Sequence, residues 1–211
     1  MLDLNQVQRQ FKQHFPDNGS PLFFSAPGRT ELAGNHCDHQ GGHVIAAAID
    51  LSIAAAVAPN SLRQIRLYSQ NFSPCILPLT EFSPIKAEAG TSVSLIRGIL
   101  AQFETMGCTL YGLDLCVCSQ VPVGGGLSSS AAFEILFAAI CNHFFCQDAL
   151  SPIQLAQIGQ KAENLYFGKP CGLMDQLSSS LGGILHMDFS NQQEPVIQSL
   201  PLPEIFPYAL C

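Results

Sequence analysis

Residues 122–132 read PVGGGLSSSAA. Three glycines lead into three serines, and two alanines then open an apolar stretch of good helix formers. Glycine removes the Cβ atoms that would keep an anion away from the backbone, and a helix N-terminus attracts negative charge. A predicted strand at 113–117 precedes the loop, whereas a flexible linker would have polar flanks. The order of strand, glycine loop and helix therefore predicts a phosphate-binding loop.

Composition limits the class of protein. The chain has 211 residues, of which 47% are hydrophobic, enough for the core of one large domain or two small ones. Only 12% are charged, against about a quarter in ordinary domains, which suggests that a partner surface is missing. The net charge of −7 argues against nucleic acid or an anionic membrane as partner. We find neither an uninterrupted apolar run of about 18 residues nor a secretory signal, so we expect no membrane span.

The pattern of the nine cysteines favours a reducing compartment. Their number is odd, most lie in apolar stretches, and no C-x-x-C pair occurs. We therefore expect reduced, buried thiols and a cytoplasmic location.

Hydrophobic periodicity predicts an α+β chain without regular βαβ alternation. The expected helices cover 3–15, 91–106, 131–145, 151–166 and 171–183. The expected strands cover 22–26, 43–57, 62–69, 113–117 and 184–189. The first strand should stop at Pro27-Gly28, and the Ala and Ile runs of the second suggest burial on both faces.

The glycine loop fits neither common nucleotide fingerprint. It lacks the Gly-Lys-Ser/Thr ending of a Walker loop and the spacing of G-x-G-x-x-G. The pattern P-x-G-x-G-L-S-S-S-A-A instead resembles the ATP-phosphate loop of the GHMP small-molecule kinases. The resemblance implies ATP as a ligand, held by Pro122, Gly124, Gly125, Gly126, Leu127, Ser128, Ser129 and Ser130.

A second stretch, SAPGRTELAGNHCDHQGGH at 25–43, is dense in hydrogen-bonding side chains although the chain is poor in charge. Such groups suit a sugar, whose hydroxyls need donors and acceptors. The stretch resembles the galactokinase sugar signature G-R-x-N-L-I-G-E-H-T-D-Y-N-G-G. The resemblance makes Arg29 catalytic and assigns Asn35, His36 and Asp38 to the sugar. Three departures from the signature matter for the sugar: Asn35 replaces Glu, Cys37 replaces Thr and His39 replaces Tyr.

A third stretch, AENLYFGKPCGLMDQ at 162–176, places an aspartate in an apolar setting. It resembles the galactokinase pattern A-E-x-x-F-x-G-x-x-C-G-I-M-D-Q. By that resemblance Asp175 is the catalytic aspartate beside the anomeric hydroxyl, and Gly172 also contacts the sugar. Glu163 would hold Mg²⁺ with a hydroxyl of Ser129 or Ser130. Lys169 is near the site in sequence, where contact with phosphate is one alternative, but we expect it to lie in a solvated loop.

The resemblance covers the chain from about residue 20 but only the first half of a galactokinase. It implies a GHMP-kinase N-terminal domain, a ribosomal protein S5 domain 2-like fold with a mixed sheet packed by helices. We expect a helical extension at 1–20 and an ATP- and sugar-binding domain at 21–211. The end of the chain, PYALC, reads as an unfinished strand, so we expect a truncated chain that lacks the C-terminal domain.

Three functions remain open at this stage. The first is transfer of phosphate from ATP to O1 of galactose. The second is a galactokinase-like sensor or gene fragment that binds sugar and ATP with little or no turnover. The third is a GHMP kinase for another sugar or a mevalonate-type alcohol.

Overall fold

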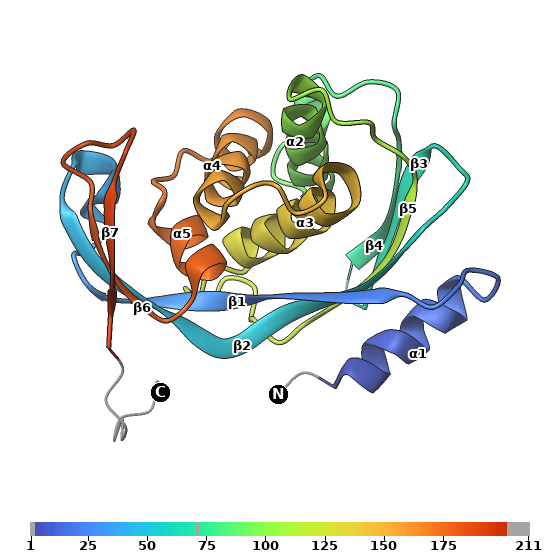
Figure 1. Ribbon diagram of the computed structural model, residues 1–211, viewed down its shortest axis with the longest axis horizontal. Helices are drawn as coiled ribbons and strands as arrows, with labels where there is room; N and C mark the ends of the chain where they lie inside the picture. The colour runs from blue at the N-terminus through green and yellow to red at the C-terminus, as the bar shows by residue number, and fades with distance from the viewer. Residues whose placement is uncertain (1–2, 71, 202–211) are drawn as a thin grey trace.

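The computed structural model describes residues 3–70 and 72–201 as a curved sheet with a layer of helices in its concave face (Figure 1). The strand order is β4-β3-β5-β2-β6-β7, and β1 pairs with β2. All pairings are antiparallel except that between β3 and β5. The strands are β1 (Leu22–Ala33), β2 (His43–Pro59), β3 (Gln64–Ser69), β4 (Phe72–Pro78), β5 (Leu113–Ser119), β6 (Ile184–Asp188) and β7 (Val196–Leu200).

The helices lie where the periodicity predicts them. They are α1 (Leu4–His14), α2 (Ser92–Thr105), α3 (Ser129–Cys146), α4 (Pro152–Ala162) and α5 (Met174–Leu181). Short helical turns cover Cys37–Gln40, Lys86–Glu88 and Glu163–Phe167, the last being a π-helical continuation of α4. Ser151 caps α4 in a reciprocal capping box with Gln154. The mixed α+β architecture expected from the sequence is confirmed.

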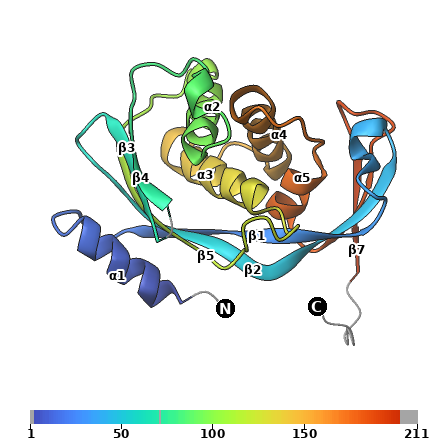
Figure 2. The ribbon, with the colours of Figure 1, turned by 180° about the vertical axis from the view of Figure 1, so that it is seen from behind.

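Strand β2 is buried on both faces, as its apolar sequence predicts. Ala55 and Val57 face the main core under the helices, with Ile99 of α2 and Phe137 of α3. The alternate residues of β2, among them Ala54 and Ala56, pack against α1 on the opposite face. Figure 2, seen from behind, also places α1 on the far side of the sheet from the other helices. Side chains of a strand alternate between faces, so one small-residue strand supports both layers.

Two local expectations were wrong or incomplete. Strand β1 does not stop at Pro27-Gly28 but continues to Ala33, with a register shift between Pro27 and Arg29. It pairs with β2 alone among the described strands, and an edge strand with a bulge tolerates both residues. Strands β4 and β7 were not predicted, because their short segments lack clear alternation. The PYALC segment lies outside the described residues.

The expectation that all nine cysteines are free thiols is also wrong. Cys108 and Cys146 form a disulfide, with Cα atoms 6.4 Å apart. The turn at Gly107 after α2 brings Cys108 beside the C-terminal end of α3. The six other cysteines among the described residues are free, and burial raises the pKa of Cys75 to about 11 and of Cys116 to about 12.

One described helix, α3, is long and apolar enough to meet a length and composition test for crossing a membrane. However, 56% of it is buried inside the fold. It is the central helix of the layer that covers the sheet (Figure 1), and a core helix of this kind meets the same test.

A partly buried ion pair joins β3 to β5, with the Asp114 side chain 1% exposed and the Arg66 side chain 29% exposed. Arg66 donates two hydrogen bonds of 2.7 Å to Asp114, which also accepts from Asn18 and Asn60. Asp114 is fully buried. We predict that Asp114→Ala lowers the free energy of unfolding by about 3 kcal/mol or more, because it leaves these donors unpaired.

Urea unfolding tests this prediction, with Arg9→Ala as the control. Arg9 pairs with Asp3 at the surface, so its loss should change stability by less than about 1 kcal/mol. Equal effects of the two substitutions would contradict the role given to Asp114.

Candidate functional site

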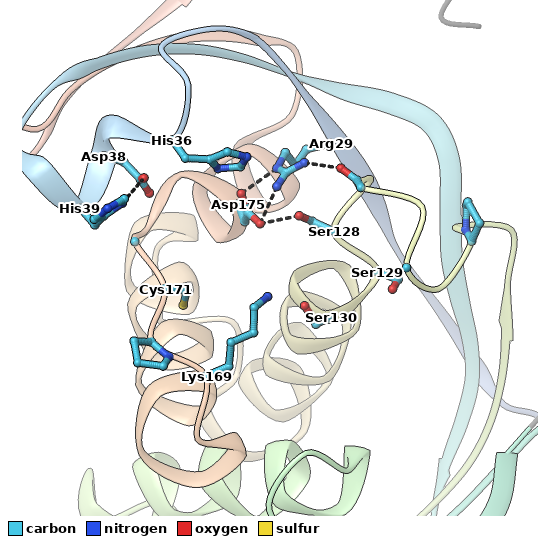
Figure 3. Close-up of a pocket in the computed structure, with 15 residues that line it drawn as sticks. Arg29, His36, Asp38, His39, Ser128, Ser129, Ser130, Lys169, Cys171 and Asp175 are labelled. Carbon is cyan, nitrogen blue, oxygen red and sulfur yellow. Dashed lines mark hydrogen bonds and ion pairs between the residues drawn. The ribbon is translucent and has the colours of Figure 1, made fainter.

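Three loops that are distant in the sequence meet at a cavity of about 490 Å³. The first connects β1 to β2, the second follows β5, and the third leads into α5 (Figure 3). The cavity therefore gathers all three stretches that the sequence singled out. Its lining includes Arg29, His36, Asp38, Pro122, Gly124, Gly126, Ser128, Ser129, Ser130, Gly172 and Asp175.

Arg29 and Asp175 form the central contact of the cavity. The guanidinium donates from Nε to Asp175 Oδ1 at 2.6 Å and from a terminal nitrogen to Oδ2 at 2.7 Å. Its remaining terminal nitrogen donates to the carbonyl of Gly126 at 2.7 Å. Arg29 is only 5% exposed. A two-bond pair of this kind fixes direction as well as charge, so it sets the position of Asp175 against the glycine loop.

The glycine loop presents open backbone to the cavity. Gly124 and Gly126 have φ near +74° and +73°, a region that other residues rarely adopt, and no atom lies within 4 Å of where a Cβ would stand. Ser128 precedes α3 with its hydroxyl bonded to Asp175, so no side chain caps the helix. The first amides of α3 are thus left to a ligand, as in anion sites at helix N-termini.

Two predicted loop residues do not line the cavity. A Cβ at Gly125 would meet the ring of Pro122 at 2.8 Å, so this glycine turns toward its own loop. Leu127 packs against the hydrophobic core, and its carbonyl accepts the backbone N–H of Arg29 at 3.1 Å. Gly125 and Leu127 therefore support the conformation of the loop on the side away from the cavity.

The loop between β1 and β2 meets the third loop through Asp38. Its buried carboxylate accepts the backbone N–H of Met174 at 3.1 Å. Gly172 lies so close that a Cβ there would stand 1.8 Å from Asp38 Oδ2. His36 also lines the cavity (Figure 3). Asn35 is exposed in a left-handed conformation and is not part of the lining.

A buried polar chain lies behind the cavity. The side-chain amide of Gln176 donates to Glu163 and to Glu134, both at 2.9 Å. Burial, followed by the charge of Glu163, raises the pKa of Glu134 well above its ordinary value. Neither Gln176 nor Glu134 was predicted as a site residue from the sequence. A charged residue in the otherwise apolar stretch 131–145 was the available signal for Glu134.

Glu163 and Ser130 offer hard oxygen donors next to this polar network. Ser130 lines the cavity, whereas Glu163 does not line it and is buried behind it. The Ser130 hydroxyl lies 3.3 Å from Glu163 Oε1, and Ser129 lines the cavity beside it. Carboxylate and hydroxyl oxygens suit Mg²⁺, which keeps several water or phosphate ligands besides one or two from protein. Within the described ranges, no three His, Cys, Asp or Glu side chains are grouped as a metal site. This donor set supplies only part of the shell that Mg²⁺ requires, and water or nucleotide phosphates would supply the remaining oxygens.

Lys169 lies closer to the site than the sequence suggested. Although 61% of its side chain is exposed, it lines the cavity and its ammonium lies 3.3 Å from Glu163 Oε1. Burial lowers the pKa of Lys169, but the Glu163 carboxylate more than offsets this and raises it overall. Cys171 follows in the same loop, and burial raises the pKa of its thiol.

Two protein-family models match this chain and define the class of protein to which its fold belongs. The family model "GHMP kinases N terminal domain" matches residues 94–183, which include the glycine loop and Asp175. The model "Galactokinase galactose-binding signature" matches residues 9–59, which include the loop between β1 and β2. The fold is thus that of a GHMP-kinase N-terminal domain.

Individual relatives show which GHMP kinases this chain is similar to. The galactokinase of Lacticaseibacillus casei is 36% identical over 182 residues, covering 86% of this chain and 46% of the relative. That of Roseiflexus sp. (strain RS-1) is 32% identical over the whole chain and 53% of its own length. The structure of Lactococcus lactis galactokinase complexed with galactose has a TM-score of 0.85 and 25% identity, covering 96% of this chain and 53% of that one. The chain belongs to the galactokinase family and corresponds to its N-terminal portion, spanning about half the length of the curated relatives it matches.

The contact between Gly172 and Asp38 gives a prediction about the loop junction. Gly172→Ala should lower the free energy of unfolding by about 1–3 kcal/mol, because the added methyl group must displace a buried carboxylate. Chemical denaturation measures the effect. Gly19→Ala is the matched control, since no atom lies within 4 Å of its Cβ position. Similar losses in both variants would contradict the steric argument.

The buried carboxyl of Glu134 gives a prediction about pH. Folding raises its pKa, so the folded chain binds this proton more tightly than the unfolded chain does. The parent should therefore lose stability as pH rises above about 4.5, the ordinary value. Glu134→Gln cannot ionise, so its melting temperature should gain on that of the parent between pH 5 and pH 8.

Thermal melting at several pH values tests this expectation. Each 1 kcal/mol of difference corresponds to about 2–4 °C in a chain of this length. The control is Glu104→Gln, at an exposed position on α2, which should show no such trend. A pH-independent difference between Glu134→Gln and the parent would show that Glu134 is ionised in both states.

Proposed function

We propose that the protein transfers the terminal phosphate of ATP to O1 of galactose, giving galactose 1-phosphate and ADP. The observation that carries the proposal is the two-bond contact between Arg29 and Asp175 at the junction of the glycine loop and the sugar-signature loop. Phosphoryl transfer depends mainly on positioning the two substrates in line and on neutralising the charge on the phosphate. A charged pair that joins the two loops serves both needs.

Asp175 and Arg29 would act on the reacting groups. The Asp175 carboxylate lines the cavity with its oxygens held by Arg29 and by the Ser128 hydroxyl, so its direction is fixed before substrate arrives. It would accept a hydrogen bond from the anomeric hydroxyl, either taking its proton or orienting it. Arg29 would hold this carboxylate in position and counter the charge on the transferring phosphate.

The sugar would bind in the half of the cavity that contains His36, Asp38 and Gly172. The Met174 amide donates to Asp38 Oδ2, and Asp38 Oδ1, which lies 3.6 Å from the His39 imidazole, would accept a hydrogen bond from a sugar hydroxyl. Asn35, exposed at the rim of this loop, would add a neutral hydrogen-bonding group where the galactokinase signature has a carboxylate. A site that pairs each hydroxyl rejects sugars that lack one.

ATP would bind through the loop of residues 122–130, with its phosphates at Gly124, Gly126 and the first turn of α3. Glu163 and the hydroxyls of Ser129 and Ser130 would hold Mg²⁺. When bound, Mg²⁺ would neutralise charge on the phosphates. The chain's own contribution is to fix Glu163, whose Oε2 is held from behind by Gln176.

We assign residues 21–211 to this ATP- and sugar-binding domain and residues 1–20 to an N-terminal extension. Because the chain spans about half the length of its relatives, a C-terminal domain would complete the cavity and close it over substrate. The substrates point to a cytoplasmic enzyme.

The proposal is tested by coupling ADP release to a readout with galactose, N-acetylgalactosamine and mevalonate as acceptors. The assay compares this chain with the full product of its gene. We expect galactose-dependent turnover in the full product and weaker turnover in this chain. Galactose binding without turnover in the full product would replace the enzyme by a sensor, and turnover only with another acceptor would replace the substrate.

Substitution of Asp175 tests the proposed catalytic role of this residue directly. Asp175→Asn keeps the shape of the side chain but removes its charge, so turnover should fall by at least about 100-fold. Affinity for ATP should stay within about threefold of the parent, because the glycine loop and the α3 amides remain. Loss of nucleotide binding in this variant would contradict the role assigned to Asp175.

A further inference from the structure

Two permanently charged basic side chains, Arg29 and Lys169, line the cavity, and only that of Lys169 is free to exchange its hydrogen-bond partner. Arg29 is buried, and all three of its guanidinium nitrogens already donate to Asp175 or to the Gly126 carbonyl. Lys169 makes one hydrogen bond, of 3.3 Å, and its side chain is largely exposed. A phosphate entering the cavity would find the donors of Arg29 committed and those of Lys169 available.

The backbone of Lys169 is fixed although its side chain is not. Its N–H donates to the carbonyl of Glu163 at 3.3 Å, and the neighbouring Gly168 N–H donates to the same oxygen at 3.0 Å. Pro170 follows and restricts the chain further. In Figure 3 the side chain rises from this anchored loop into the cavity, toward the N-terminal turn of α3 and Asp175. A four-carbon side chain on a fixed base can move its ammonium within the cavity without moving the loop.

The side chain of Glu163, unlike that of Lys169, is fixed in position. It is 2% exposed, and Gln176 holds its Oε2 from the protein side. Its Oε1 faces both the Lys169 ammonium and the Ser130 hydroxyl at 3.3 Å. The ammonium therefore lies against the carboxylate oxygen that a divalent cation at Ser130 and Glu163 would also need. Two cations cannot share that oxygen without repulsion.

We propose that Lys169 is a phosphate-binding residue: its ammonium pairs with Glu163 in the free protein and transfers to the phosphates of ATP when the nucleotide binds with Mg²⁺. This inference rests on the proposed function. The exchange keeps Glu163 neutralised in both states and adds a mobile positive charge to the phosphate site. In the galactokinase pattern A-E-x-x-F-x-G-x-x-C-G-I-M-D-Q, position 169 is unspecified, so the lysine belongs to this chain rather than to the pattern.

The test measures two affinities in the parent, Lys169→Met and Lys169→Arg: that of a fluorescent ATP analogue with Mg²⁺, and that of Mn²⁺ alone. Lys169→Met should bind the nucleotide about tenfold more weakly or worse, since a charge-assisted hydrogen bond is lost. The same variant should bind Mn²⁺ at least about threefold more tightly, because the competing cation is gone. Lys169→Arg keeps the charge and should stay within about threefold of the parent for the nucleotide.

Lys161→Met, at an exposed position on α4, is the matched control and should change neither affinity. Unchanged nucleotide binding in Lys169→Met would overturn the proposal, and so would weaker rather than tighter Mn²⁺ binding, which would leave Lys169 a purely structural partner of Glu163. Lys169→Gln replaces the methionine variant if that variant melts early. A parent that binds no nucleotide would contradict the proposed function itself, and this inference with it.

Discussion

The two hydrogen bonds between Arg29 and Asp175 are the constraint on which the rest of the site depends. Arg29 is on an edge strand, Asp175 is in the first turn of α5, and the third guanidinium nitrogen reaches the glycine loop. A buried guanidinium needs partners for its donors, so none of these three segments can shift alone. The contact thus makes one cavity out of loops that are far apart in the sequence.

The same turn of α5 also reaches the proposed cation site. Asp175 points into the cavity, whereas its neighbour Gln176 points into the protein and holds both Glu163 and Glu134. Successive residues of a helix face different directions, so one turn can position both a reacting group and the support of a metal ligand. Glu134 is the less stable part of this arrangement, since its Oε1 and the Oε1 of Gln176 have no partner among the described residues. Burial of these unpaired polar atoms lowers stability, whereas the two hydrogen bonds from the Gln176 amide hold the carboxylates in place.

Much of the architecture could be predicted because it follows from local patterns. The spacing of apolar residues predicts the helices, the two-sided burial of β2 and the strand before the glycine loop. Pro27 was misread because a strand's tolerance of proline depends on whether a neighbour pairs with it, which is a tertiary property. The disulfide between Cys108 and Cys146 could not be seen, since nothing local brings these residues together. Asp175, Arg29 and Glu163 came from resemblance to a family, whereas Lys169 and Gln176 needed the fold to show what they face.

A double-mutant cycle between Arg29 and Asp175 tests the central claim most directly. The free energy of unfolding is measured in urea for Arg29→Met, Asp175→Asn, the double variant and the parent. If the pair joins the three segments, either single change leaves the other partner stranded, and the double variant should be more stable than the sum of the two losses predicts by about 1.5 kcal/mol or more. Losses that add to within about 0.5 kcal/mol would contradict the claim, because they would mean that each side chain acts without the other.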